Sequence, residues 1–429
     1  MKTINDLTRG WLGLVVLVSS TVLSCASTGP EAEDSVAAEL GLKPGLVSQL
    51  RQVAPGFAVA LVDEHGVLWS KGYGVANLRN RTPVTADTSF WLASVSKAVM
   101  GIAIAHAQER GLLSLDTEVR RLVATRAHFR IASPSDAALP LRELVTHTSP
   151  VRDSKFYACS YYFGPERGGQ TSLFNAFRSV SSDFSDPALA DLTCDEHTPA
   201  SLSGFLRSYL DRRGSYYSPD NFGSTGPNPV YSNVGAALAG YAFELATGRS
   251  LADYAKTNLF RPLGMIHTSW ELDDLAAAEI ASPYVWDEAH SRYVELPLYS
   301  LSTWPDGGLR SSARDLGRLL ATIINAGSLN GTRILQPKSV EQMLTPVVSE
   351  DGVGFGIFWA TFSGDSGQTL IGHDGGDPGA ATQMYFDPVA RVGVVLLTNT
   401  DDARLSGALP DVLSELFDSA RRLHAARYP

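Results

Sequence analysis

Segments with strand-like patterns lie near both ends of the 429-residue chain, and segments with helix-like spacing lie between them. Residues 56–77 form two apolar runs around the polar turn Asp63-Glu64-His65-Gly66, which predicts a β-hairpin. Further short strands are expected at residues 355–360, 369–372, 383–386 and 392–398. Apolar spacing predicts helices at residues 96–110, 141–146, 234–247, 251–259, 313–326 and 407–426. This order predicts an α+β fold, in which terminal helices flank one antiparallel sheet and a helical lobe is inserted within it.

The first 45 residues have the pattern of an export signal followed by a tether. Lys2 and Arg9 precede an apolar stretch at residues 11–23, which has the length of a signal peptide and is too short to span a bilayer comfortably. The stretch ends in Val22-Leu23-Ser24-Cys25, which resembles a bacterial lipobox; the alternative is ordinary cleavage nearby, with Cys25 incidental. We therefore expect a signal peptide at residues 1–24, a tether at 25–45 and one domain at 46–425. The expected location is periplasmic or in the cell envelope, with lipidation of Cys25 as the anchor to a bacterial membrane.

Composition narrows the class of partner. The net charge is −10, and the chain has no basic runs, which excludes a typical nucleic-acid-binding protein. At 44% hydrophobic residues the chain can form a full globular core. The sequence lacks paired Cys-x-x-Cys and His-x-x-x-His spacings, so no metal site is indicated. We expect no cofactor, and a small ester, amide or peptide as the substrate.

Two cysteines remain when Cys25 is set aside, and both lie in an unusual segment. Residues 150–229 are rich in Ser, Gly, Tyr and Asp and have the character of an elaborated loop region, which is often functional at this length. In an exported chain, Cys159 and Cys194 are expected to form a disulfide, which stabilises by roughly 3–4 kcal/mol in the chain-entropy model. The alternative is two unpaired thiols. We refer to residues 150–229 as the insertion.

The strongest candidate for chemistry is the pair Ser94 and Lys97. Residues 98–105 are apolar nearly all round, so this helix should be buried, and a buried lysine is rare without a partner or a function. Of the seven lysines only Lys97 has a serine three positions before it, a spacing that places both side chains on one helix face. Desolvation lowers the pKa of a lysine, so its neutral amine can take the serine proton. The alternative is a helix-capping serine and a structural lysine.

Two weaker motifs follow at wide spacing. In Tyr231-Ser232-Asn233, the first and third residues of an extended segment share a face, and a tyrosine beside a cationic lysine can lose its proton more easily. In His373-Asp374-Gly375-Gly376, the glycines leave room for a substrate backbone along a strand edge. Taken alone, the first motif is more typical of a helix entry with a packed tyrosine, and the second of a turn or surface histidine.

The three motifs in this order resemble the serine beta-lactamase and penicillin-binding family. In the family's Ser-x-x-Lys pattern, serine is the nucleophile. The likeness is greatest to class C beta-lactamases and their esterase and D-amino-acid peptidase relatives. Ser94-Val95-Ser96-Lys97 is similar to the first motif, Tyr231-Ser232-Asn233 to the second, and His373-Asp374-Gly375 to the third, which is Lys-Thr-Gly or His-x-Gly. The resemblance covers about residues 46–425 and includes the stretches 144–149, 259–265 and 307–315.

The resemblance implies a beta-lactamase-like fold and a serine hydrolase. Ser94 would be acylated, Lys97 and Tyr231 would move protons, and Asn233 would orient Lys97 and the substrate carbonyl. The oxyanion hole would consist of the backbone N–H groups of Ser94 and Gly376.

The third motif departs from the beta-lactamase pattern. Where beta-lactamases bind the drug's carboxylate with lysine and a hydroxyl group, this chain has His373 and Asp374, a poor site for an anion. An esterase or D-peptidase is therefore favoured. The alternatives are a beta-lactamase, and a non-catalytic sensor that binds peptidoglycan peptides or beta-lactams.

Overall fold

The computed structural model describes residues 45–133, 137–164, 170–195, 201–224, 226, 228–348, 353–363, 368–401 and 404–428. The expected signal peptide, Cys25 and all but the last residue of the tether lie outside these residues. Within the described part of the chain, no helix combines the length and the apolar character needed to cross a membrane.

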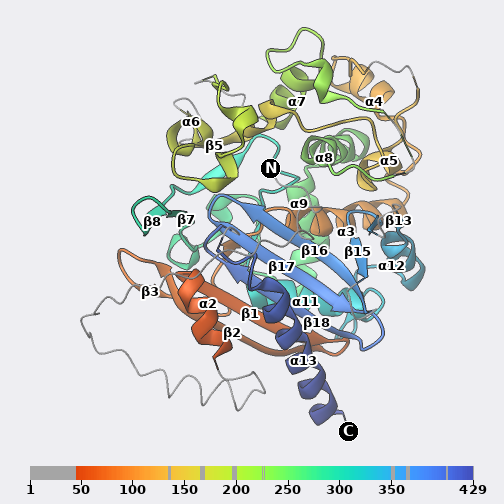
Figure 1. Cartoon of the computed structure of the whole chain (residues 1–429). Coiled ribbons are helices and arrows are strands. Elements are labelled where there is room, and N and C mark those ends of the chain that lie inside the picture. The colour runs from red at the N-terminus through yellow and green to blue at the C-terminus, as the bar shows by residue number, and fades with distance from the viewer. Residues whose placement is uncertain are drawn as a thin grey trace.

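A nine-stranded antiparallel sheet forms the base of the molecule, in the order β13-β14-β15-β16-β17-β18-β1-β2-β3 (Figure 1). The first and last thirds of the chain meet at its centre, where β1 pairs with β18 from Phe57 opposite Thr398 to Asp63 opposite Val392. The bounds are β1 Gly56–Asp63, β2 Gly66–Asn77, β3 Thr82–Pro83, β13 Val347–Val348, β14 Gly354–Phe355, β15 Ala360–Ser363, β16 Thr369–Asp377, β17 Ala380–Asp387 and β18 Val392–Thr398. The predicted hairpin and α+β class are confirmed.

The terminal helices α2 (Leu46–Val53) and α13 (Leu409–Arg427) cover one face of the sheet (Figure 1). Their apolar residues pack with Phe57, Val59 and Leu61 of β1 in one core cluster. The alternate residues of β1, Ala58, Ala60 and Val62, face a larger cluster on the other side. Successive side chains of a strand point to opposite faces, and both faces are covered here. Every residue of β1 is therefore buried, which accounts for its near-continuous apolar run.

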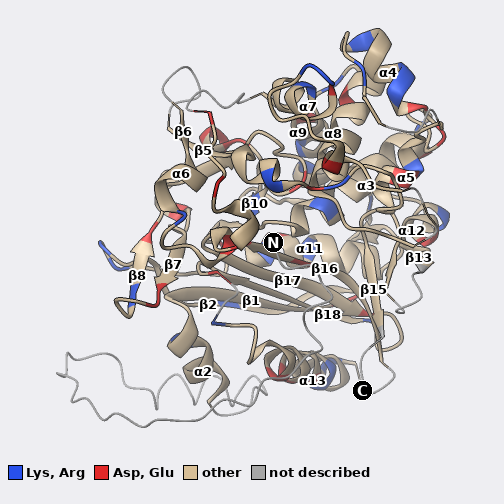
Figure 2. Ribbon diagram, turned by 45° about the horizontal axis from the view of Figure 1, so that its top comes forward, with Lys and Arg blue, Asp and Glu red and all other residues tan. Residues whose placement is uncertain are grey.

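The helical lobe lies on the second face. Its helices are α3 Val95–Glu109, α4 Val119–Arg126, α5 Leu141–Val145, α8 Asn233–Thr247, α9 Leu251–Ala255, α10 Arg261–Leu263, α11 Ala313–Ile324 and α12 Pro337–Leu344. Helix α3 is buried on nearly all sides, as its apolar sequence predicted. Small strands complete this side: β4 Phe90–Trp91, β7 Tyr284–Asp287, β8 Arg292–Glu295, β9 Tyr299–Leu301, β10 Arg310–Ser311, β11 Ser328–Leu329 and β12 Thr332–Arg333. Charged residues lie mainly on the helices and loops around the sheet (Figure 2).

The insertion contributes β5 Tyr161–Phe163, β6 Thr171–Ser172, α6 Leu173–Phe177, α7 Leu202–Leu210 and the 3₁₀ helix η2 Lys155–Ser160. A disulfide joins Cys159 to Cys194, whose Cα atoms are 5.3 Å apart, as cysteine usage predicted. Strand β5 pairs with β9, so backbone hydrogen bonds attach the insertion to the lobe.

Two predicted elements are interrupted in the structure. The single strand expected at residues 355–360 is divided into β14 and β15, because Phe358 has a left-handed backbone conformation (φ 58°) and its N–H group bonds to Val145 of the lobe. The helix expected at 251–259 ends as α9 at Ala255 and continues as a π-helical turn, Lys256–Phe260. Apolar spacing does not encode either change, because both depend on packing against other parts of the chain.

Candidate active site

Ser94 and Lys97 lie at the start of α3. Ser94 is the N-cap residue, and Ala93 before it has a left-handed backbone conformation (φ 49°), which turns the chain from β4 into the helix. This conformation is costly for a residue other than glycine and is often found at functional sites. The Nζ atom of Lys97 lies 3.0 Å from the Oγ atom of Ser94. The spacing therefore brings a hydroxyl and an amine within proton-transfer distance.

Lys97 is fully buried, and its surroundings favour a neutral amine. Nζ donates hydrogen bonds to Oδ1 of Asn233 at 2.6 Å and to the backbone carbonyl oxygen of Asp306 at 2.8 Å. Burial lowers the pKa of Lys97, and the negative charge of Asp306 is the largest influence that raises it. A neutral amine has two hydrogens and one lone pair. With the hydrogens on Asn233 and Asp306, the lone pair is available to the Ser94 hydroxyl group.

Tyr231 lies beside this pair. Its ring centroid is 5.0 Å from Nζ of Lys97, its ring stacks on His147, and its hydroxyl group is hydrogen-bonded to the side chain of Ser94. Burial raises the pKa of Tyr231 well above its usual value, so the expected easier loss of its proton is not what the structure supports. Desolvation of the phenolate outweighs the hydrogen bond with Ser94, and the nearby carboxylates raise the pKa further. Tyr231 is therefore a phenol that can relay a proton.

Asn233 is the first residue of α8, and a carboxylate from the insertion fixes it. Asp153 accepts hydrogen bonds from both the backbone N–H and the side-chain amide of Asn233, and from the hydroxyl group of Ser232. The amide oxygen of Asn233 is thereby directed to Lys97. Sequence reasoning missed Asp153. In the folded chain this residue lies at the N-terminus of α8, a place that is typical of an acidic residue.

Gly375 on β16 lies directly beneath the start of α3. A Cβ atom at this position would lie 2.3 Å from the carbonyl oxygen of Leu92 and 3.0 Å from the backbone nitrogen of Ser94. Only glycine lets the strand approach Ser94 this closely. Gly376, the next residue, is exposed. Strand β15 pairs with β16 only up to Gly372, so the strand edge from His373 onwards is free of it.

His373 is buried beside the ring of Tyr231, and Asp374 follows it at the strand edge. Burial lowers the pKa of His373 to about 4, so the imidazole is neutral at physiological pH. Its Nδ1 atom lies 2.6 Å from the carbonyl oxygen of Asp374, and the Asp374 carboxylate lies 3.9 Å from the same nitrogen. At this end of β16 the Asp374 carboxylate is therefore negatively charged, and the neutral imidazole of His373 does not balance that charge.

Two buried carboxylates behind Lys97 were also missed from the sequence. Asp306 and Asp377 lie in segments with the composition of turns, and both accept hydrogen bonds from tyrosines of the insertion. Tyr157 donates to Asp306, and Tyr161 donates to Asp377, which also accepts from the indole N–H group of Trp91. A carboxylate in a glycine-rich turn gives no local signal that it faces a lysine more than 200 residues away.

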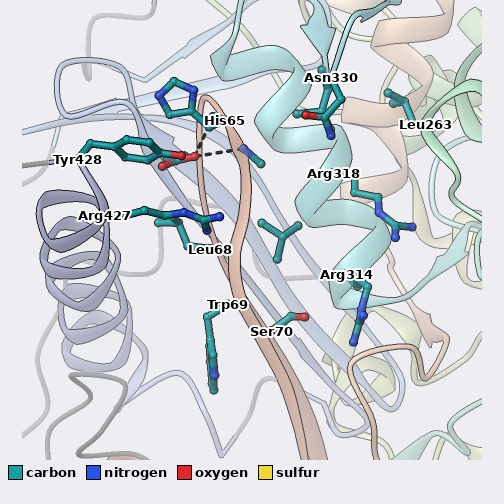
Figure 3. Close-up of a pocket in the computed structure, with 14 residues that line it drawn as sticks. His65, Leu68, Trp69, Ser70, Leu263, Arg314, Arg318, Asn330, Arg427 and Tyr428 are labelled. Atoms are coloured by element: carbon teal, nitrogen blue, oxygen red, sulfur yellow. Dashed lines mark hydrogen bonds between the residues drawn. The ribbon is translucent and has the colours of Figure 1, made fainter.

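A cavity of about 570 Å³ lies elsewhere, between the β1–β2 turn, α11 and the end of α13 (Figure 3). Three arginines line it, but two are engaged within the protein: Arg314 pairs with Asp87, and Arg318 bonds to Asp315 and to the carbonyl oxygen of Gly264. None of the catalytic candidates lines this cavity. The chemistry is therefore located by the Ser94–Lys97 geometry and not by the size of a cavity.

Comparison with protein families finds a match to the family described as Beta-lactamase over residues 42–172 and 179–413. The chain belongs to the beta-lactamase family. This family match covers α3, α8 and β16, and thus the whole candidate site. The resemblance found in the three motifs is confirmed.

The share of a relative's length that this chain matches differs between members of the beta-lactamase family. Esterase EstB of Burkholderia gladioli is 26% identical, and the match covers 92% of this chain and 99% of the esterase. Penicillin-binding protein 4* of Bacillus subtilis is 26% identical over 78% of this chain and 66% of that protein. The chain spans 58–66% of the length of the first curated relatives that match it.

The fold agrees with solved structures of the same group. The octameric penicillin-binding protein homologue from Pyrococcus abyssi superimposes with a TM-score of 0.66 at 23% sequence identity, covering 88% of this chain and 77% of that chain. At this identity the likeness establishes a beta-lactamase-like fold alone.

Proposed function

We propose that the chain is a serine hydrolase that forms an acyl-enzyme on Ser94 and cleaves an ester or amide bond. One observation carries this proposal: the Nζ atom of Lys97 lies 3.0 Å from Oγ of Ser94. The lysine side chain is buried, and burial lowers its pKa, which favours the neutral amine. A serine hydroxyl is a weak nucleophile until a base accepts its proton, and a desolvated lysine is such a base.

In the first half of the reaction, Oγ of Ser94 attacks the carbonyl carbon and its proton passes to Nζ of Lys97. The oxyanion that forms would be stabilised by the backbone N–H groups of Ser94 and Gly376, with Gly375 keeping strand and helix close enough for both to reach it. As the intermediate collapses, the bond to the leaving group breaks. The leaving oxygen or nitrogen receives the proton from Lys97 through the hydroxyl group of Tyr231, which remains a phenol.

In the second half, water attacks the acyl carbon and the same groups act in reverse. One proton of the water passes to the Tyr231–Lys97 pair and then to the departing Oγ of Ser94, which restores the free enzyme. Asn233 keeps Lys97 in place throughout, because Asp153 fixes its amide and its oxygen accepts from Nζ.

Neutral esters and amides are the favoured substrates. The end of β16 presents a neutral His373 and the Asp374 carboxylate, which would repel the carboxylate of a beta-lactam drug. The match with the Burkholderia gladioli esterase over nearly its whole length supports the same choice.

Covalent labelling tests the assignment directly. The wild-type protein should react with a fluorophosphonate probe and hydrolyse p-nitrophenyl acetate, and Ser94→Ala should do neither while keeping its thermal unfolding transition. Ser96→Ala is the matched control, because it removes a neighbouring hydroxyl group that bonds to the backbone of Leu309 and not to Lys97. Undiminished hydrolysis by Ser94→Ala would refute the nucleophile, and a wild-type protein that binds cephalosporins without turnover would indicate a sensor.

We further propose that the chain is exported and lipidated at Cys25. The apolar N-terminal stretch with its lipobox-like end, together with the disulfide in the insertion, supports an oxidising location. Intact-mass analysis of protein purified from membranes should show a diacylated chain that begins at Cys25. A chain that begins elsewhere without lipid would exclude the anchor.

A further inference from the structure

We propose that Asp306 is a positioning residue for the base: it balances the charge of Lys97 when Ser94 gives up its proton, and Tyr157 of the insertion holds it in that place. This inference rests on the proposed function, since it assigns the partner of the proposed base. The geometry that carries it is a buried lysine and a buried carboxylate with one tyrosine behind them.

The contact between the two charged groups is close and dry. Oδ2 of Asp306 lies 4.0 Å from Nζ of Lys97, and both side chains are completely buried. The backbone carbonyl oxygen of Asp306 also accepts a hydrogen bond from Nζ, so the residue contacts Lys97 with both its backbone and its side chain. An isolated charge at such a place is costly, whereas a pair with zero net charge is tolerated.

The protonation of the two groups is coupled. Burial raises the pKa of Asp306 to about 7 against the influence of Lys97, and burial lowers the pKa of Lys97 against the influence of Asp306. Each group thus influences the protonation of the other, and a pH profile reports the pair and not either residue. When Ser94 transfers its proton to Lys97, the carboxylate of Asp306 can neutralise the ammonium group that forms.

Other titratable groups also face the pair. Asp377 lies near both members, and Asp153 and Asp374 exert weaker attractions on Lys97. Further titratable neighbours are His147, Tyr231, His373 and the insertion residues Tyr157 and Tyr161. The two histidines have lowered pKa values and are neutral at physiological pH, and burial raises the pKa values of the three tyrosines. Asp306 is thus the carboxylate with the largest effect on Lys97.

Tyr157 connects this pair to the insertion. Its hydroxyl group donates a hydrogen bond of 2.5 Å to Oδ2 of Asp306, the same oxygen that faces Lys97. Tyr157 lies on η2, two residues before Cys159 of the disulfide. The insertion is therefore more than a cover for the substrate, because one of its side chains is hydrogen-bonded to the carboxylate that controls the base.

The test is the pH dependence of kcat/KM for p-nitrophenyl acetate in Asp306→Asn. Asparagine keeps the size of the side chain and can still accept from Tyr157, but it removes the charge. Without that charge the pKa of Lys97 falls, so the acid limb should move to lower pH by at least about one unit, since Lys97 stays neutral longer. The plateau should fall by roughly ten- to one-hundred-fold, because a weaker base and an unbalanced ammonium group slow the proton transfer.

Two tyrosine variants separate positioning from general loosening. Tyr157→Phe removes the hydrogen bond to Asp306 and should shift the acid limb in the same direction by a smaller amount. Tyr161→Phe is the matched control: it is a buried tyrosine of the same insertion that donates to Asp377, whose influence on Lys97 is weaker than that of Asp306, so its shift should be smaller than that of Tyr157→Phe. Equal shifts in both variants would overturn the proposal. If Asp306→Asn does not fold, the contrast between these two variants decides.

The outcomes distinguish this inference from the proposed function. A superimposable pH profile for Asp306→Asn, or a lower plateau with an unmoved acid limb, would overturn the role of Asp306. Hydrolysis that survives Lys97→Met would instead overturn the assignment of the base itself. Loss of activity in Lys97→Met together with a shifted limb in Asp306→Asn would support both.

Discussion

The edge of β16 and the insertion both contribute to the surroundings of the Ser94–Lys97 pair, but they are held in place by different means. Strand β16 is positioned by backbone pairing with β17 from Ile371 to Asp377, and close contact with α3 requires a glycine at position 375. The insertion has only short helices and strands. A disulfide joins two of its own residues, and buried tyrosines attach it by donating to carboxylates elsewhere in the fold.

The difference indicates where substitutions should affect chemistry and where they should affect stability. A strand that lies against Ser94 has no room for change, because a small displacement moves the proposed oxyanion-binding groups. A segment held by a few separate side-chain contacts can loosen before the catalytic geometry is lost. We expect large catalytic effects from β16 and mainly stability effects from the insertion, apart from Asp153 and Tyr157.

The largest effect is expected from Gly375→Ala. The added methyl group would overlap the carbonyl oxygen of Leu92 at 2.3 Å and force β16 away from α3. We expect kcat/KM for esters to fall by roughly one-hundred-fold or more, with a loss of about 1–3 kcal/mol in unfolding free energy from overpacking. The control is Gly407→Ala, where a Cβ atom has open space. Full activity in Gly375→Ala would show that the close approach is not needed for catalysis.

The second effect is on stability and concerns the insertion. Replacement of Cys159 and Cys194 by serine opens a loop of 35 residues and should lower the unfolding free energy by roughly 3–4 kcal/mol. Ester turnover well below the unfolding temperature should fall much less than in Gly375→Ala. Reduction of the wild-type disulfide should give the same shift in Tm. If the double variant instead lost activity while keeping its Tm, the contrast between the two regions would be wrong.

The third effect is the pH dependence that His373 gives to stability. Its pKa is about 4 in the folded chain and near 6.5 when unfolded, so the unfolded chain binds the proton first as the pH falls. Stability contributed by the neutral histidine is complete above pH 6.5 and is lost between pH 6.5 and 4. Compared with His373→Asn, the wild type should lose roughly 2–3 kcal/mol more between pH 7.5 and 4.5. Parallel denaturation curves for the two proteins at both pH values would contradict this expectation.

The smallest effect is a change in substrate preference. Asp374→Thr removes the negative charge at the edge of β16, which is worth about 1–2 kcal/mol, or roughly ten-fold in rate, for a substrate with a carboxylate. Acylation by nitrocefin should therefore rise more than turnover of p-nitrophenyl acetate changes. A wild-type protein that already hydrolyses both equally well, with no effect of the substitution, would show that this motif does not set the preference.

Much of the fold was predictable because it depends on local patterns. Strand β18 has the predicted bounds, α3 differs from prediction by one residue at each end and α8 by one residue at its start, and the β1–β2 hairpin turns at the predicted residues. The strand expected at 355–360 was not predictable in its true form, since the bend at Phe358 arises from a hydrogen bond to α5.

The sequence by itself determined the pair at the centre of the proposed chemistry. The spacing of Ser94 and Lys97 places them on one face of a helix turn, and the apolar residues that follow require the helix, and therefore the lysine, to be buried. Only the tertiary structure decided the protonation of that pair and its neighbours. Asp306, Asp153 and the tyrosines of the insertion come together from segments far apart in the chain. The direction of the Tyr231 pKa shift depends on how completely those segments exclude water, which no local pattern records.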